Sequence, residues 1–130
     1  MTSETDKAQF KALHAMMWVT DVPRAVEYYS KKLGCELVYQ EDDCSDFAIV
    51  ARDQIQFHIQ ICACDDGRHT GNTFIEVEVN DAVALHDELQ SAGAIIEREL
   101  KHQDWGSSDF KVADLDGNWI LFTSDTPDLG

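Results

Sequence analysis

The apolar positions along this chain follow two periods that alternate in a regular order. Apolar side chains occupy every second position of residues 13–19, 55–61 and 75–79, which predicts strands with two distinct faces. Residues 22–33 and 82–92 instead carry apolar side chains at helical spacing, so an amphipathic helix is predicted in each. The pattern therefore predicts a mixture of strands and helices.

The ends of both predicted helices are marked by residues that start or stop a helix. Asp21 and Asp81 precede them, where an aspartate side chain accepts hydrogen bonds from the free N–H groups of the first turn. Pro23 fits only a first turn, and Gly34 and Gly93 follow the last turns, where glycine readily takes positive φ. The same signals recur at nearly the same spacing, so the chain contains an internal repeat.

Three further strands are predicted after each helix. They cover residues 36–40, 47–50 and 55–61 in the first half, and residues 95–100, 110–113 and 119–122 in the second. Each half is then a βαβββ module, about residues 11–66 and about residues 71–125. The two modules together predict a single α+β domain over residues 1–130.

The stretch from Trp105 to Phe122 carries a more specific pattern. A Trp-Gly pair is followed by Phe110, then by the turn Asp114-Leu115-Asp116-Gly117-Asn118, and then by an apolar strand. This resembles the C-terminal hairpin of the glyoxalase, bleomycin-resistance and extradiol-dioxygenase superfamily, also called vicinal oxygen chelate proteins. The Trp-Gly pair looks most like the bleomycin-resistance branch, whereas Leu115 stands where the family usually has proline. Together with the repeated modules, the resemblance extends over roughly residues 11–124.

This resemblance implies an eight-stranded open cup with the helices outside and the binding site in the cup. A second subunit often completes such a cup, so a homodimer is expected. The strand faces that point away from the helices would line the cup, and a slip of one residue in a strand would invert that assignment. The candidate ligand-binding residues are His14, Met16, Trp18, Gln56, His58, Gln60, Phe74, Glu76, Glu78, Trp105, Trp119 and Leu121.

Metal-dependent members of the family hold a divalent ion with His, Gln or Glu side chains from four positions. The resemblance puts His14 at the first position, Phe74 at the second and Leu121 at the last. The remaining position falls on the strand that contains His58 or one of the glutamines beside it. Phe74 and Leu121 cannot bind a metal, and two histidines are fewer ligands than a catalytic zinc site uses. We therefore expect no metal, no cofactor and no catalytic residue, with His14 and His58 as the remaining metal candidates.

The acidic composition of the chain indicates which kinds of binding partner are expected. The chain has 25 acidic and 10 basic residues, a formal charge of −15, which argues against nucleic acid and anionic membranes as partners. A cationic small molecule would be attracted, although acidity can also serve solubility alone. The sequence has neither a run of about 18 apolar residues nor an apolar signal core, which predicts a cytoplasmic protein without a membrane span. The four cysteines are expected to be reduced thiols.

Two functions fit these patterns. In the first, the protein resembles bleomycin-resistance proteins, which hold a flat, cationic aromatic drug in the cleft of a dimer without making or breaking a bond. Trp18, Phe74 and Trp119 would then stack on the ligand, and Glu76 and Glu78 would supply negative charge. The alternative is a metal-dependent lyase, isomerase or dioxygenase of the same superfamily, which needs a ligand set that this sequence lacks. The sequence favours the first function and leaves the identity of the ligand open.

Overall fold

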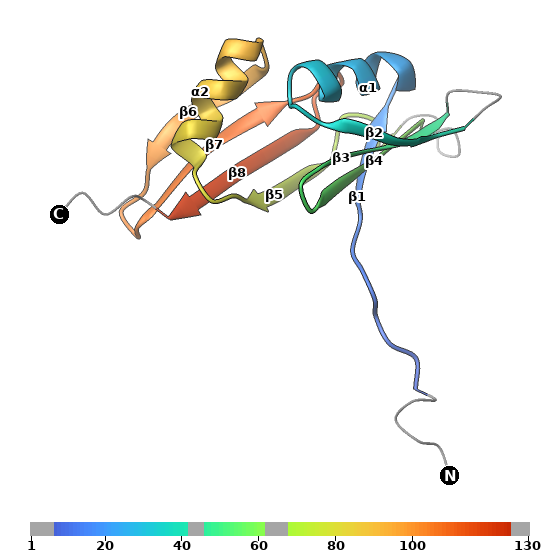
Figure 1. The fold of residues 1–130 in the computed structure, drawn as a ribbon, viewed down its shortest axis with the longest axis horizontal. Helices are drawn as coiled ribbons and strands as arrows, with labels where there is room; N and C mark the ends of the chain where they lie inside the picture. Colours follow the sequence, from blue (N-terminus) through green and yellow to red (C-terminus); the bar gives the residue numbers. More distant parts are fainter. Residues whose placement is uncertain (1–6, 42–45, 62–67, 126–130) are drawn as a thin grey trace.

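The computed structural model of the chain describes residues 7–41, 46–61 and 68–125. The first module contains β1 (Ala15–Val19), α1 (Val22–Lys31), β2 (Glu36–Gln40), β3 (Phe47–Arg52) and β4 (Ile55–Ile61). The second contains β5 (Phe74–Glu78), α2 (Ala82–Ala92), β6 (Ile95–His102), β7 (Ser107–Ala113) and β8 (Trp119–Asp125). The predicted order of elements is therefore confirmed in both halves, as Figure 1 shows.

The helix boundaries follow from the residues that mark them in the sequence. The Asp21 carboxylate accepts a hydrogen bond from the backbone N–H of Arg24 at 3.0 Å, and Asp81 accepts one from Ala84 at the same distance. Gly93 has φ of +90° at the end of α2, where the left-handed conformation lets the chain turn back toward the sheet. Both predicted caps are therefore confirmed.

The strands form two four-stranded mixed sheets rather than a closed barrel. The strand order is β1-β4-β3-β2 in one sheet and β5-β8-β7-β6 in the other, and the β1–β4 and β5–β8 pairs are parallel. Both helices lie on the same side of the two sheets, which leaves the opposite faces uncovered (Figure 1). This α+β architecture confirms the predicted fold class.

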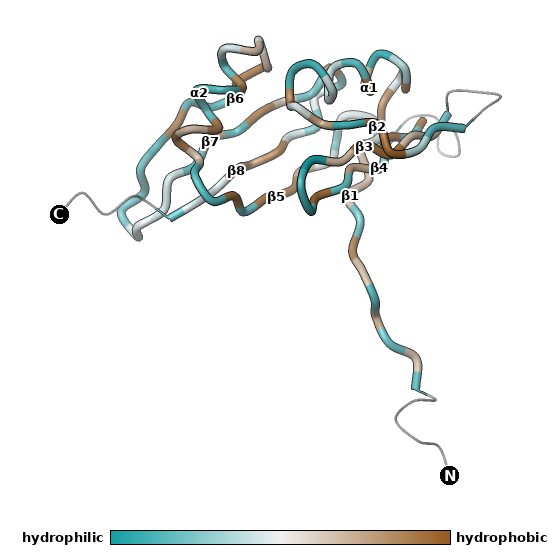
Figure 2. The backbone as a smooth tube through the Cα atoms, viewed as in Figure 1, coloured by the Kyte–Doolittle hydropathy of each residue, from teal (hydrophilic) through white to brown (hydrophobic). Residues whose placement is uncertain are grey.

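Burial alternates along the strands as the sequence pattern predicts. Met17 and Ile59 on the helix side are fully buried, whereas their neighbours Met16 and His58 on the uncovered side are only half-buried. The register sets Met16 beside His58 and, in the second sheet, Phe74 beside Trp119. Figure 2 shows the resulting hydrophobic stretches along the strands. The uncovered faces therefore carry four of the side chains that the sequence assigned to the cup, namely Met16, His58, Phe74 and Trp119.

The start of β1 differs from the sequence prediction. The alternation of apolar and polar residues in the sequence starts at Leu13, but the strand starts at Ala15. The partner of Ala15 is Phe57, near the start of β4. Before that point the described chain extends away from the body (Figure 1), and Phe10 and Leu13 are 108% and 98% exposed. Alternating polarity predicts that a strand is possible, but hydrogen-bonding partners on the neighbouring strand decide where it starts.

The turn between β7 and β8 joins the two modules. The Asp114 carboxylate accepts hydrogen bonds from the backbone N–H groups of Asp116 and Asn118, both at 2.9 Å, which confirms the predicted turn. The same carboxylate accepts a bond from the Tyr29 hydroxyl at 2.8 Å, and the Asn118 amide donates to the Trp18 carbonyl at 3.0 Å. The turn is therefore also the main polar connection between the first module and the second.

The remaining expectations concern the membrane and the cysteines. No helix among the described residues is long and apolar enough to cross a membrane. Cys35 is a buried free thiol, and burial raises its pKa to about 11. Cys44, Cys62 and Cys64 lie outside the described residues.

Candidate functional site

A groove of about 880 Å³ lies where the two modules meet, between the start of β1, the β3–β4 turn and β5. Four of the candidate residues predicted from the sequence line it. His14 lies just before β1, Met16 lies on β1, Gln56 on β4 and Glu76 on β5. Pockets for small molecules commonly have volumes of about 300–1,000 Å³, so the groove is large enough for a drug-sized ligand. We call this cavity the groove.

An aromatic pair stands on the uncovered face of the second sheet. Phe74 and Trp119 are neighbours in the β5–β8 register, and their ring centroids lie 5.9 Å apart at an interplanar angle of 82°. The Lys111 ammonium nitrogen lies 4.3 Å from the Trp119 ring centroid and 5.2 Å from that of Phe74. A cation therefore already occupies the π-surface of this pair.

Charged side chains from β6 and β7 share this sheet face, and sequence reasoning missed them. Asp109 is buried and pairs with the guanidinium of Arg98, while the Gln103 amide donates to both carboxylate oxygens at 3.1 and 3.2 Å. Lys111 alternates with the core residue Phe110, and this alternation was a usable signal. The face is consequently a mixture of positive and negative groups rather than a purely acidic surface.

His58 forms a second cluster with two other rings. Its ring lies 4.5 Å from that of His14 in a stacked arrangement and 5.6 Å from that of Phe47, edge to face. Its Nε2 atom is buried and has no hydrogen-bond partner among the described residues. Burial, with a smaller contribution from His14, lowers the pKa of His58, so the ring is neutral at neutral pH. A neutral imidazole can donate one hydrogen bond to a ligand or accept one from it.

The donor atoms present do not fit a divalent metal. Among the described residues no group of three His, Cys, Asp or Glu side chains lies close enough to hold an ion. His14 and His58 stack ring on ring, and the family positions at Phe74 and Leu121 are apolar.

The other predicted site residues are spread over the molecule. Trp18 lies 6.3 Å from His69, ring to ring, and pairs in register with Gln60. Trp105, just before β7, is 76% exposed and does not line the groove. Glu78, although it shares a strand face with Glu76, stands at the end of β5 and lines a separate cleft on the helix side. The structure thus brings the candidates together as small clusters rather than as one pocket.

Two βαβββ modules with helices on one side and open sheet faces on the other define the glyoxalase and bleomycin-resistance class of α+β proteins. Comparison with known families agrees: the family model of the Glyoxalase/Bleomycin resistance protein/Dioxygenase superfamily matches residues 11–122. The chain belongs to this superfamily.

Several relatives are similar to the chain over most of its length. The bleomycin resistance proteins of Geobacillus stearothermophilus and Staphylococcus aureus are 26% identical over 120 residues, covering 80% of this chain and 89% of theirs. Among solved structures, a bleomycin-binding protein from Streptomyces verticillus, complexed with copper(II)-bleomycin, has a TM-score of 0.72 and 25% identity, covering 94% of this chain and 100% of that one. TioX from Micromonospora has a TM-score of 0.70 at 21% identity, with 92% and 100% coverage, which shows the fold alone.

Proposed function

We propose that the protein binds a flat, cationic small molecule on the uncovered side of its sheets and holds it without chemical change. The observation that carries this proposal is the position of the Lys111 ammonium group over the rings of Phe74 and Trp119, because rings that hold a cationic side chain are suited to a ligand cation. A planar ligand cation would replace the lysine on the rings. The relatives named for bleomycin resistance and bleomycin binding support a ligand of this kind.

The charges around the groove support the same preference. Glu76 lines the groove, is exposed and pairs in register with Leu121, so its carboxylate faces the space a ligand would enter. The formal charge of −15 would also accelerate the encounter with a cation, an effect that falls as salt is added.

Calorimetric titration with N-methylacridinium, a flat cation, and with acridine-9-carboxylate, its flat anionic counterpart, tests the proposal. The cation should bind more tightly, and the variant Trp119→Ala should weaken it because one stacking surface is lost. Lys111→Met should tighten the cation about two- to tenfold, since its own ammonium no longer competes for the rings. Glu76→Gln should weaken binding, and Glu97→Gln, an exposed site on β6 outside the groove, is the matched charge control.

The opposite pattern would refute this function. If the anion binds better than the cation and Lys111→Met abolishes its binding, Lys111 is an anion-binding residue and the cation proposal is wrong. If neither compound binds and bleomycin fails as well, the site does not sequester planar ligands of this charge.

We also propose that the protein works as a homodimer. Phe10 and Leu13 are exposed on a chain segment that extends from the body, and packing both side chains on a second subunit would remove their apolar surface from water. Repulsion between acidic subunits opposes association, so the dimer should tighten as salt rises. Sedimentation at micromolar concentration should show a dimer, and the double variant Phe10→Ser, Leu13→Ser should weaken it. A monomer at moderate salt would contradict the proposal.

A further inference from the structure

A second cavity opens on the helix side of the molecule, away from the aromatic pair. It has a volume of about 610 Å³ and lies between α2, the chain just after α1, and the seam between the modules. Its walls are mainly apolar and include Leu33, Phe57, Leu85 and Phe122. We call this cavity the cleft, and its size is within the usual range for small-molecule pockets.

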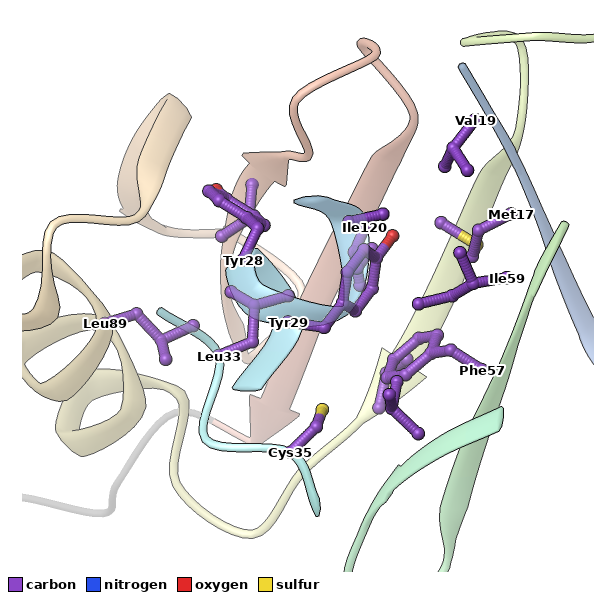
Figure 3. Close-up of a cluster of buried hydrophobic side chains, with 14 of the residues drawn as sticks. Met17, Val19, Tyr28, Tyr29, Leu33, Cys35, Phe57, Ile59, Leu89 and Ile120 are labelled. Atoms are coloured by element: carbon purple, nitrogen blue, oxygen red, sulfur yellow. The ribbon is translucent and has the colours of Figure 1, made fainter. Parts of the chain in front are cut away.

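The internal repeat explains why the cleft exists. Tyr29 follows the helix cap Asp21 at the same spacing at which Leu89 follows Asp81, so the two residues are equivalent in the two modules. Tyr29 is completely buried, and its ring lies 5.4 Å from that of Phe57 of the sheet (Figure 3). Leu89 is also buried, but its side chain is smaller and has no ring to project across the seam. One end of the seam is therefore filled by a tyrosine, and its counterpart is left hollow.

The polar groups at the two ends differ in the same way. Arg52 follows Val50 at the spacing at which Asp114 follows Val112, and both valines pair with core residues of the next strand. At the filled end Asp114 accepts a hydrogen bond from Tyr29. At the hollow end Arg52 instead forms a bidentate ion pair with Glu88, with N–O distances of 2.7 and 2.9 Å. This pair spans the cleft but does not fill it.

The rim of the cleft is acidic. Its charged residues are Asp53, Glu78, Asp81, Glu88 and Arg52. The guanidinium of Arg52 is engaged by Glu88 and by the Leu33 carbonyl, and its Nε atom lies 3.9 Å from the Asp53 carboxylate, so it offers little to an incoming anion. Asp53 and Glu78 are exposed carboxylates at the rim. An apolar interior below an excess of carboxylates complements a molecule with an apolar ring and a positively charged end.

We propose that the cleft is a second small-molecule site, beside the groove on the helix side, that takes an aromatic ammonium compound. The ring would occupy the space that Tyr29 fills at the other end of the seam, and the ammonium would lie between Glu78 and Asp53. The cleft borders the groove and shares Asp53, Gln54, Ile55 and Val77 with its lining, but it requires no participation of Lys111 or of the aromatic pair.

The test is an NMR titration of the whole protein, labelled at its leucine and valine methyl groups, with 2-phenylethylammonium. The uncharged 2-phenylethanol and the anionic 3-phenylpropionate serve as comparison compounds of similar shape. The ammonium compound should shift the methyl signals of Leu33, Leu85 and Leu89, the alcohol should bind more weakly, and the carboxylate should bind least. Glu78→Gln should weaken the ammonium about two- to fivefold, and Glu97→Gln should not.

A second variant tests the location without disturbing the core. Ala84 is exposed on α2 and lines the mouth of the cleft, so Ala84→Phe should obstruct entry and weaken binding about tenfold or more. Gln90→Phe places the same ring on an exposed position of α2 outside the cleft and should leave binding unchanged. The proposal is overturned if the carboxylate binds as well as the ammonium, if Ala84→Phe binds normally, or if no methyl signal of the cleft responds.

Discussion

Removing one hydroxyl group from the seam tests whether the two modules are stabilised as a unit. Tyr29 is 0% exposed, and its hydroxyl donates to Asp114 at 2.8 Å. The carboxylate of Asp114 accepts all four of its hydrogen bonds to described residues, two of them from the side chain and the backbone of Asn118, which matches an ionised carboxylate. A hydrogen bond to a charged group contributes about 1.5–3 kcal/mol, so Tyr29→Phe should cost that much of the unfolding free energy.

Thermal and urea denaturation measure this loss. For a domain of this size the predicted change corresponds to a Tm that is lower by roughly 5–11 °C. Tyr39→Phe is the matched control, because Tyr39 is 50% exposed and its loss of a hydroxyl should change stability by less than about 0.5 kcal/mol. A cost below about 0.5 kcal/mol for Tyr29→Phe as well would show that the bond to Asp114 adds little and does not stabilise the contact between the two modules.

The same pair makes a prediction about alkaline pH. Burial raises the pKa of Tyr29 well above its usual value, and the negative charge of Asp114 adds to this effect. Because the folded pKa exceeds the unfolded one, the contribution of Tyr29 is complete below about pH 10 and is lost as pH rises toward the folded pKa. The stability of the wild type should therefore fall more steeply above about pH 10 than that of Tyr29→Phe.

Two further predictions follow from buried or strained positions. The thiol of Cys35, with a pKa raised to about 11 by burial, should react with iodoacetamide much more slowly in the folded protein than in urea, as measured by mass spectrometry of its peptide. Equal rates would show that it is accessible. Gly71→Ala should destabilise the fold by more than about 1 kcal/mol, because φ is +75° and the new Cβ would clash with the backbone oxygen of Asp116. Gly106 has φ of +99° but open space around it, so Gly106→Ala should lower the unfolding free energy by less. An equal loss for both variants in urea denaturation would show that φ alone causes the effect.

The repeated modules were predictable because their signals are local. A capping aspartate such as Asp21 acts on the N–H groups of its own first turn, and alternation along residues 54–61 depends only on neighbouring residues. The β7–β8 turn was also local, since Asp114 bonds to Asn118 a few residues away. What these patterns could not show is that the turn also bonds Tyr29 and the Trp18 carbonyl, because those contacts join distant parts of the chain.

The site was less predictable because it depends on register and on long polar side chains. The sequence assigned Phe74 and Trp119 to one face correctly, but which residue would cover them required the β7–β8 register that places Lys111 opposite Leu121. The burial of Asp109 likewise depends on Arg98 from β6, across an irregular pairing. A strand face read from alternation gives the side chains available, whereas the register decides which of them meet.

Glu76 and Glu78 share one face of a strand but line different cavities. They lie on one face of β5, about 7 Å apart, yet Glu76 lines the groove and Glu78 lines the cleft. In about 0.01 M salt the screening length is about 30 Å, so each carboxylate attracts cations to both cavities, and Glu76→Gln and Glu78→Gln should each weaken both ligands. Near 1 M salt the length is about 3 Å, shorter than the distance between the two carboxylates, and each variant should then weaken mainly the ligand of its own cavity. Calorimetry of N-methylacridinium and 2-phenylethylammonium at the two salt concentrations would measure this separation. If the two variants remain indistinguishable at the higher salt, the glutamates serve one continuous site, and the assignment of two cavities fails.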